Sequence, residues 1–297
     1  MGTRIRIQAR FTAAAAAGVL GTGLLTAAVT SPAESAVTAT TGPSCGTVVI
    51  TKADGSPWTC TFADEFTGTK LDTTKWVPQL TATSGFDQGG VCYTDSSTNL
   101  AVTQGALKLT LKRASWATTC KSTRGNFSTK YSSGMVSTYT KFTQAYGRFE
   151  IRAKFGTTKQ PGHQSAFWLY PEVPGNIWPY SGEIDIAEWY SKYPDRVIPF
   201  LHYGGTYYDP YATNNNCKVA NVGSAWHTYA LEWTPQTIKF IYDDQVCLTN
   251  STASGKDPFN KNYMVALTQL LGTGVNAPNV FTPSTGSMTV DYVRVWA

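Results

Sequence analysis

The segment Gly147-Arg-Phe-Glu-Ile-Arg-Ala-Lys-Phe155 alternates strictly between apolar and charged side chains. Because successive side chains of a β-strand point to opposite faces, this alternation predicts a strand with one buried face. The same two-residue period recurs at 107–111, 229–233 and 238–242, and clusters of Gly, Asn, Asp, Ser and Pro separate the runs. No stretch of the region after residue 36 sustains an apolar 3.6-residue period over a dozen residues. The pattern therefore predicts an all-β sandwich or barrel.

The first 36 residues have the layout of a secretory signal. Three arginines precede a weakly hydrophobic run over residues 11–29, and small residues follow it. A membrane anchor is the alternative, because the run approaches the roughly 18 apolar residues that a spanning helix needs. We favour export, since the run lacks an aromatic belt. We expect a signal peptide over 1–36, a flexible lead-in over 37–43, one domain over 44–297, and a secreted, extracellular protein without membrane association after cleavage.

Six cysteines follow residue 36, an even number that indicates disulfides in an exported chain. Many pairings are open, and we expect the sequential one, because each pair then closes a short loop between neighbouring strands. A zinc site is disfavoured, since no C-x-x-C occurs and the three histidines are widely spaced. The cysteines are Cys45, Cys60, Cys92, Cys120, Cys217 and Cys247.

The charge of the chain argues against a nucleic-acid partner. The formal net charge is +5, and loss of residues 1–36 removes three Arg and one Glu, which leaves a mild +3 without any basic run. Aromatic residues make up 13% of the chain, with 9 Trp and 16 Tyr. Some of these rings belong to the core, but the surplus suits a sugar-binding cleft.

Three carboxylates lie within six residues in Glu183-Ile-Asp-Ile-Ala-Glu188. Ordinary alternation places Glu183 and Asp185 on one face of a strand and Glu188 on the other. A one-residue β-bulge within 186–188 would return Glu188 to the shared face. We expect this bulge, and with it three acids in one groove.

Such crowding is costly, because like charges in a partly dry cleft repel and raise one another's pKa. Glycoside hydrolysis uses that repulsion: one carboxylate attacks the anomeric carbon, and a second, held protonated, gives its proton to the leaving oxygen. The structural alternative is an edge strand whose solvated acids guard against aggregation. The pattern alone leaves both interpretations open.

The neighbourhood of the acids resembles glycoside hydrolase family 16, a group of secreted β-glycanases. The segment from Trp178 to Glu188 is similar to the family's catalytic segment in its bulged form. The resemblance implies a concanavalin-like β-jelly-roll sandwich, with Glu183 as nucleophile, Asp185 as the acid that orients it, and Glu188 as general acid and base. Further similar segments are Phe62–Gly68, Tyr146–Lys154, Ala166–Leu169, His227–Pro235 and Val290–Val295.

The same resemblance implies five substrate contacts. Trp178 is expected to stack on a sugar beside the cleaved bond, and Trp168 to lie in the cleft, with a buried core position as the alternative. His202 is similar to a histidine on the leaving-group side, although a lone histidine is more often structural. Asn99 resembles an early polar contact and Gln269 a late one.

The resemblance implies a polysaccharide substrate, most simply a β-1,3-glucan cut within the chain, and a monomeric enzyme. One departure concerns this assignment: His163-Gln164-Ser165 stands where laminarinases often have Leu-Trp-Pro. The alternatives are a mixed-linkage glucan, a galactan, or a lectin without catalysis. A Ser-His-Asp hydrolase is disfavoured, because the chain has no G-x-S-x-G elbow. No redox or organic cofactor is expected; a structural Ca²⁺ is compatible with the family, but no Asp-rich loop identifies one.

Overall fold

The computed structural model describes residues 42–172, 177–204 and 206–297. The predicted signal peptide over 1–36 lies outside the described residues, as does most of the predicted lead-in. No helix among the described residues is both long enough and apolar enough to cross a membrane. The boundaries of the predicted domain, 44–297, stay a prediction.

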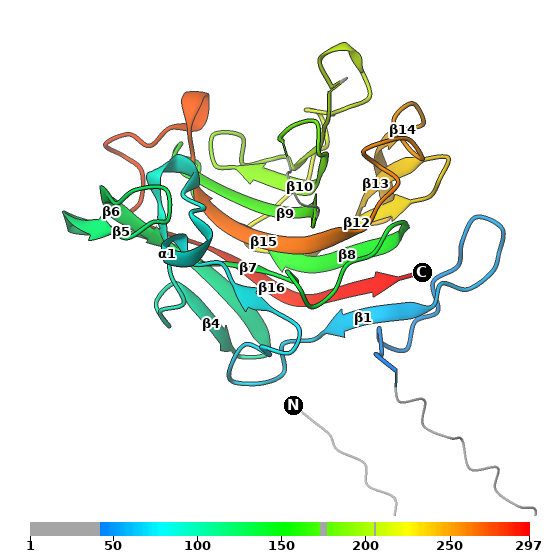
Figure 1. The fold of residues 1–297 in the computed structure, drawn as a ribbon, viewed down its shortest axis with the longest axis horizontal. Coiled ribbons are helices and arrows are strands. Elements are labelled where there is room, and N and C mark those ends of the chain that lie inside the picture. The colour runs from blue at the N-terminus through cyan, green and yellow to red at the C-terminus, as the bar shows by residue number, and fades with distance from the viewer. Residues whose placement is uncertain (1–41, 173–176, 205) are drawn as a thin grey trace, which may run out of the picture. The chain divides into compact units, whose positions relative to one another are not determined.

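The described chain forms two antiparallel-rich sheets that stack face to face (Figure 1). The larger sheet has ten strands, and β1 and β4 pair with β16 and β5 beside its main path. Its members are β14 (Gln245–Asn250), β13 (Ile238–Tyr242), β12 (His227–Trp233), β8 (Gly147–Lys154), β16 (Thr285–Trp296), β5 (Ala106–Cys120), β6 (Phe127–Ser133), β3 (Cys92–Tyr93), β1 (Cys60–Asp64) and β4 (Leu100–Thr103).

The smaller sheet has six strands, and the three carboxylates lie on its second strand. In order across the sheet its members are β11 (Ile198–His202), β10 (Glu183–Tyr190), β9 (His163–Pro171), β15 (Tyr263–Leu271), β7 (Met135–Ser137) and β2 (Val77–Pro78). The helical turns of the described chain are short: α1 (Thr81–Ser84), η1 (Gln88–Gly90), η2 (Thr206–Tyr208) and η3 (Gly274–Asn276). The all-β prediction is confirmed.

The core lies between the two sheets and follows the predicted alternation. On β8, Phe149, Ile151 and Ala153 are fully buried, and they belong to one apolar cluster with Leu169 of β9 and Ile184 of β10. Burial of apolar surface contributes about 25 cal/mol per Å² removed from water. Packing between the sheets therefore buries the face of β10 that carries Ile184, and the opposite face is left for the cleft.

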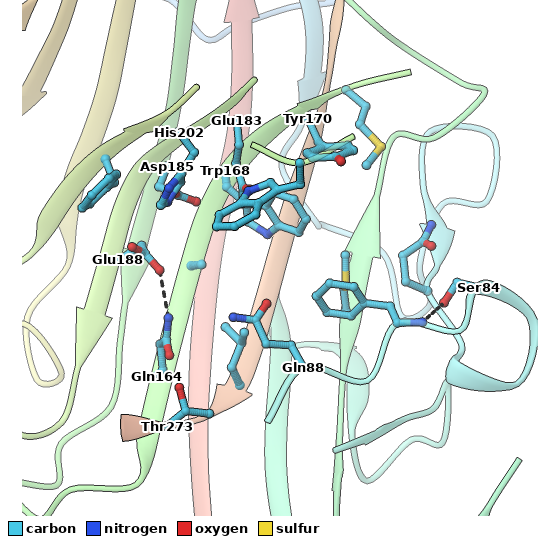
Figure 2. A pocket seen from close by; sticks show the side chains of 18 of the residues that line it. Ser84, Gln88, Gln164, Trp168, Tyr170, Glu183, Asp185, Glu188, His202 and Thr273 are labelled. Atoms are coloured by element: carbon cyan, nitrogen blue, oxygen red, sulfur yellow. Dashed lines mark hydrogen bonds and ion pairs between the residues drawn. The ribbon is translucent and has the colours of Figure 1, made fainter. Parts of the chain in front are cut away.

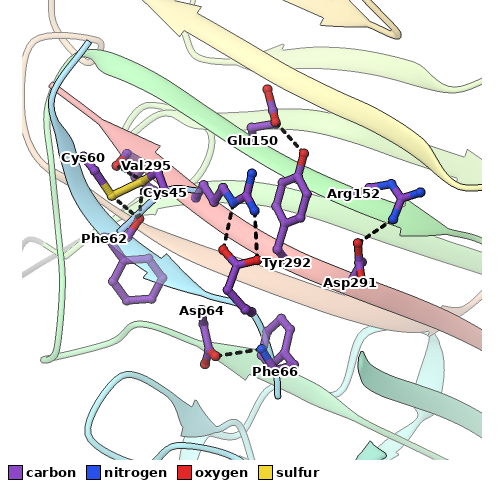
Figure 3. A network of polar contacts seen from close by, with 12 residues as sticks. Cys45, Cys60, Phe62, Asp64, Phe66, Glu150, Arg152, Asp291, Tyr292 and Val295 are labelled. Atoms are coloured by element: carbon purple, nitrogen blue, oxygen red, sulfur yellow. Dashed lines mark hydrogen bonds and ion pairs between the residues drawn. A yellow bond between two sulfur atoms is a disulfide. The ribbon is translucent and has the colours of Figure 1, made fainter. Parts of the chain in front are cut away.

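The opposite face of β8 is also buried in part, which alternation does not predict. Arg148 and Glu150 are only 7% and 5% exposed. Arg148 donates to Glu150 and, at 2.9 Å, to Glu232 of β12, while the Tyr292 hydroxyl donates to Glu150 at 2.7 Å (Figure 3). Burial of these charges is tolerable because each has partners. The polar face of this sheet is thus tied together by an ion-pair network.

Three disulfides join the six cysteines in the predicted sequential pairing. Cys45–Cys60 ties the N-terminal segment to β1 (Figure 3), and Cys92–Cys120 joins β3 to the end of β5. Cys217–Cys247 links the loop after β11 to β14. The cross-links restrict the unfolded chain and so favour the folded sandwich.

Candidate active site

Strand β10 contains the expected bulge. Against β9, Asp185 pairs with Trp168 and Ala187 with Phe167, so two steps along β10 match one step along β9. Against β11, Asp185 pairs with Phe200 and Glu188 with Ile198, which is the same one-residue excess. The consecutive residues Ile186 and Ala187 are both buried in the core, and Glu188 therefore returns to the face of Asp185.

The three acids of β10 line a cleft of about 750 Å³ on the smaller sheet. The cleft runs across several strands, because its wall includes residues of β7, β9, β10, β11 and β15. Figure 2 shows Glu183, Asp185 and Glu188 close together, with the ring of Trp168 beside them. The structure thus brings together the three residues that the sequence singled out.

Both carboxylate oxygens of Glu188 are held by neutral donors. The Gln164 amide donates to Oε1 at 2.8 Å (Figure 2), and the Tyr190 hydroxyl donates to Oε2 at 2.9 Å. Gln164 faces the site because β9 pairs with β10, and Tyr190 because it lies two residues after Glu188. An amide nitrogen can only donate, whereas a hydroxyl can donate or accept. A proton on Glu188 therefore belongs on Oε2.

Glu183 and Asp185 each have an aromatic partner. The Trp178 indole N–H donates to Glu183 Oε2 at 2.6 Å, and this ring lies 5.3 Å from the His202 ring. His202 Nε2 lies 3.0 Å from Asp185 Oδ2, and its ring stacks on Phe200 at 4.2 Å. The charges of Asp185 and Glu188 both act on Glu183, because the three acids share one face of β10.

Burial raises the pKa of all three acids above their usual values. For Glu183 the pKa lies well above that range, first through burial and then through the charge of Asp185. Burial and the charge of Glu188 raise the pKa of Asp185 well above its usual value. Burial raises the pKa of Glu188 as well, but the hydrogen bonds from Tyr190 and Gln164 oppose the rise. The cleft can hold one protonated and one ionised carboxyl near neutral pH.

Three of the five predicted substrate contacts line the cleft: Trp178, Trp168 and His202. Trp178 is 55% exposed, which leaves much of its ring open to a ligand. Trp168 is only 8% exposed, and its N–H donates to Thr268 at 2.9 Å. Trp168 therefore serves both as a wall of the cleft and as part of a buried cluster. Their contact with substrate stays a prediction.

Asn99 and Gln269, the other two predicted contacts, lie outside the lining of the cleft, and their contact with substrate stays a prediction. Asn99 is 2% exposed, and its amide donates to the Thr110 carbonyl at 2.8 Å. Gln269 is fully buried; it accepts a hydrogen bond from Ser165 and donates to the Gln164 carbonyl at 2.9 Å. Both amides thus have hydrogen-bond partners inside the protein.

The sequence reasoning missed Gln164 and Tyr190 as partners of Glu188. Tyr190 carried a signal, because alternation after the bulge places it on the face of Glu188. Gln164 carried none, since it is 24 residues away in the chain and only the register of β9 brings it near. Two further residues at the cleft wall, Phe86 and Arg124, come from the segments beside α1 and between β5 and β6.

The described residues contain no group of three or more His, Cys, Asp or Glu side chains that could hold a metal ion. Ca²⁺ also takes backbone carbonyls and water as ligands, and those ligands lie outside this finding.

Similar proteins identify the family of this fold and cleft. The family "Glycosyl hydrolases family 16" matches residues 89–294. A glucan endo-1,3-β-glucosidase of Cryptopygus antarcticus is 27% identical, over 80% of this chain and 92% of that protein. An endo-1,3-1,4-β-glycanase of Rhizobium meliloti is 31% identical, over 82% of this chain and only 53% of that protein.

The solved structure of the laminarinase from Rhodothermus marinus has the same fold. It superposes with a TM-score of 0.67 at 27% identity, over 80% of this chain and 97% of that one. This likeness confirms the predicted β-jelly-roll sandwich, which places a catalytic strand in a cleft on one sheet. The family match spans the bulged strand β10 and both of its neighbours. The chain belongs to glycosyl hydrolases family 16.

Proposed function

We propose that this glycoside hydrolase cuts internal β-1,3-glucosidic bonds with retention, using Glu183 as nucleophile and Glu188 as general acid and base. The observation that carries the proposal is the bulge at Ile186, because it puts both residues on one wall of the cleft. Such a carboxylate pair serves glycoside hydrolysis, and our proposal takes the double-displacement route, in which the protein forms a covalent glycosyl intermediate.

In the first step, a Glu183 carboxylate oxygen attacks the anomeric carbon while the bond to the leaving oxygen breaks. The electron pair of that bond goes to the leaving oxygen, which takes the proton from Glu188 Oε2. The Gln164 amide supports this assignment, because it keeps Oε1 as the unprotonated oxygen. The Tyr190 hydroxyl is the group that Oε2 faces before the substrate oxygen arrives.

In the second step, Glu188 is ionised and takes a proton from water while that water attacks the anomeric carbon. The bond to Glu183 breaks, its electron pair returns to the carboxylate, and the sugar leaves with its original β configuration. Exclusion of water from the cleft strengthens the electrostatic interactions that both steps use.

Asp185 acts as a positioning residue for Glu183. Asp185 lies on the same face of β10 as Glu183, and its carboxylate is fixed by His202 Nε2 at 3.0 Å. Burial and the charge of Glu188 raise the pKa of Asp185 well above its usual value, and in our proposal Asp185 is the protonated neighbour when Glu183 is the ion. The Trp178 N–H then stabilises that ion from the other side.

The substrate class rests on the relatives. The two relatives described above are named for β-1,3-glucan or mixed β-1,3-1,4-glycan cleavage, and the similar solved structure is a laminarinase. The mixed-linkage activity of the Rhizobium meliloti relative makes a mixed-linkage glucan the second candidate. A galactan remains the third candidate, and binding without cleavage remains the non-enzymatic one.

A reducing-end assay on laminarin, curdlan, lichenan and a galactan separates these candidates. We expect release of new reducing ends from laminarin and curdlan, at a higher kcat/KM than from lichenan or the galactan. Binding to laminarin without any release would favour a lectin, and preferential release from lichenan would move the assignment to mixed-linkage glucan.

Azide rescue tests which acid performs which role. For Glu183→Ala, added azide attacks from the free face in one displacement, so the product should be an α-glycosyl azide. For Glu188→Ala, azide should intercept the covalent intermediate and give a β-glycosyl azide. The reverse pair of configurations would exchange the two assignments, and equal α-products would contradict a covalent intermediate.

We also propose that the protein is secreted and acts as a monomer. Three disulfides among the described residues support an oxidising compartment. Mass spectrometry of protein from a culture medium should find a mature N-terminus near residue 37. Sedimentation velocity should give the mass of one chain.

A further inference from the structure

Four tyrosines in the loops before β10 and after β11 are unusually exposed. Tyr207 and Tyr208 are 91% and 85% exposed, and Tyr180 and Tyr211 are 67% and 56% exposed. Large exposed aromatic groups that gather in one place usually mark a binding surface. The catalytic steps above use none of these four rings.

Topology brings the loops that carry the four rings to the same end of the smaller sheet as Trp178. Strand β10 begins at Glu183 and β11 ends at His202, and these two residues are direct partners in the sheet. The loop before Glu183, residues 177–182, and the loop after His202 therefore leave the sheet side by side. The loops also touch, because a Cβ added to Gly204 would lie 2.8 Å from the ring of Tyr180.

The loop that carries Tyr207, Tyr208 and Tyr211 is held firmly by Asp209. One carboxylate oxygen accepts hydrogen bonds from the Tyr203 hydroxyl at 2.7 Å and from Asn250 of β14, and the other accepts from the Tyr211 backbone N–H at 2.8 Å. A ring on an anchored loop loses little freedom when a ligand binds, which favours affinity. Tyrosine adds to this, since it offers a large contact area with few rotatable bonds.

The charge of this region favours a neutral ligand. Asp209 is the single charged residue in the sequence from 203 to 216, and its carboxylate is already bonded within the protein. No cationic side chain belongs to that stretch, and the nearby Arg196 donates to the Asn215 carbonyl and pairs with Asp195. The flat faces of the rings suit the C–H faces of pyranose sugars, and the hydroxyl groups can bond to sugar hydroxyls.

We infer that Tyr180, Tyr207, Tyr208 and Tyr211 form an aromatic platform that continues the cleft beyond Trp178 and binds further pyranose residues of a long neutral polysaccharide. The inference rests on the proposed function, because it takes the cleft to hold the same chain. The ring centroids of Tyr207 and Tyr208 lie 5.1 Å apart, and the two ring planes meet at 89°. One ring can therefore meet a sugar by its face while the other meets it by its edge.

The platform predicts that long chains bind better than short ones. The test uses Glu183→Gln protein as the background, so that the ligand is not consumed, and compares Tyr207→Ala/Tyr208→Ala with the parent. Isothermal titration with laminarin and with laminaritriose measures the Kd of each. We expect the Kd for laminarin to rise about tenfold, and the Kd for laminaritriose to stay unchanged because the short chain fits within the cleft.

Two control variants separate stacking from other causes. Trp116→Ala removes another exposed ring, 77% exposed on β5, and should change neither Kd. Tyr207→Phe/Tyr208→Phe keeps both ring faces, so it should bind laminarin nearly as well as the parent. Thermal melts should coincide for all variants, because each altered side chain is exposed.

Several outcomes would overturn the inference. An unchanged Kd for laminarin in the double alanine variant, or an equal loss for laminarin and laminaritriose, would remove the platform. A dimer of the parent that the double alanine variant abolishes in sedimentation velocity would assign the rings to self-association. Wild-type protein that binds laminarin through the platform but does not cleave it would refute the proposed function alone.

Discussion

The hydrogen bond from Tyr190 to Glu188 gives the sharpest prediction about catalysis. The substitution Tyr190→Phe removes the hydroxyl that lies 2.9 Å from Glu188 Oε2 and leaves the Gln164 bond to Oε1 in place. The hydroxyl donates to the ionised carboxylate and accepts from the protonated one. Its removal therefore changes the protonation equilibrium of Glu188 only by the difference between two bonds.

That difference sets the expected size. A hydrogen bond to a charged group contributes roughly 1.5–3 kcal/mol, and one between neutral groups about 0.5–1.5 kcal/mol. The bond from Tyr190 thus favours the ionised form by about 1.3 kcal/mol, the difference between the mid-points of the two ranges, which is nearly tenfold in the equilibrium. In Tyr190→Phe the pKa of Glu188 rises further, because burial is then less opposed. The proposed general acid keeps its proton to higher pH.

The assay is the pH dependence of kcat/KM on laminarin, normalised to the plateau of each enzyme. On the alkaline limb, Tyr190→Phe should be about tenfold more active than wild type at the same pH. The matched control is Tyr170→Phe, because Tyr170 also lines the cleft but its hydroxyl contacts Ser181. Its alkaline limb should coincide with that of wild type.

An alkaline limb that stays in place, or moves to lower pH, would refute the assignment of Glu188 as the acid. A uniform loss of activity at every pH would mean that Tyr190 contacts the substrate and does not tune Glu188. A shift of the same size in Tyr170→Phe would show that a change in the general polarity of the cleft is responsible.

Three further predictions concern stability. Glu188→Gln should raise the free energy of unfolding at pH 7 by about 1–2 kcal/mol in urea titrations. The folded state raises the pKa of this carboxyl, so the wild-type protein loses stability as pH rises above 4.5. The gain in the variant should vanish below pH 4.5, and a gain that persisted there would have another origin. Asn99→Ala should cost about 1–3 kcal/mol by leaving the Thr110 carbonyl without its partner. KM for laminarin tests the predicted substrate contact: an unchanged KM would make the role of Asn99 structural alone, and a raised KM would support the contact. Replacing both Cys217 and Cys247 by Ser should cost about 3–4 kcal/mol, because the bridge closes a loop of 30 residues, and calorimetry showing no loss would mean that the unfolded chain is already compact.

The geometry of β10 was predictable in detail, because residues 183–188 must bury apolar side chains on one face and bring their three acids to the other. Alternation places Ile184 in the core, and the position of Glu188 then requires one extra residue before it. The structure puts that residue at Ile186, where the register shifts against both neighbouring strands. The sequential disulfides were predictable for a related reason, since neighbouring strands in sequence are often neighbours in the sheet.

The buried charges of β8 show where alternation stops being informative. Arg148 and Glu150 sit at positions that the period assigns to the exposed face, yet Glu232 and Tyr292 from two other strands cover them. A one-strand pattern contains no information about which side chains lie across the sheet. Gln164 escaped prediction for the same reason, because its role depends on the register of β9 against β10.

The resemblance pointed to three acids that line the cleft and to two amides, Asn99 and Gln269, that lie outside its lining. Asn99 and Gln269 are polar residues in segments near the cleft, and their sequence does not distinguish a side chain that points to substrate from one that supports a neighbouring backbone. Hydrogen bonds in the structure make the distinction. The Gln269 amide donates to the Gln164 carbonyl, so it supports the backbone of β9.

The stereochemistry of the first product tests the central claim most directly. Proton NMR during the earliest turnover of laminarin distinguishes the new reducing ends before they mutarotate. Double displacement at Glu183 predicts that the β-anomer appears first and that the α-anomer grows in later. The α-anomer appearing first would mean a single displacement by water, and the account of Glu183 as a nucleophile would then be wrong.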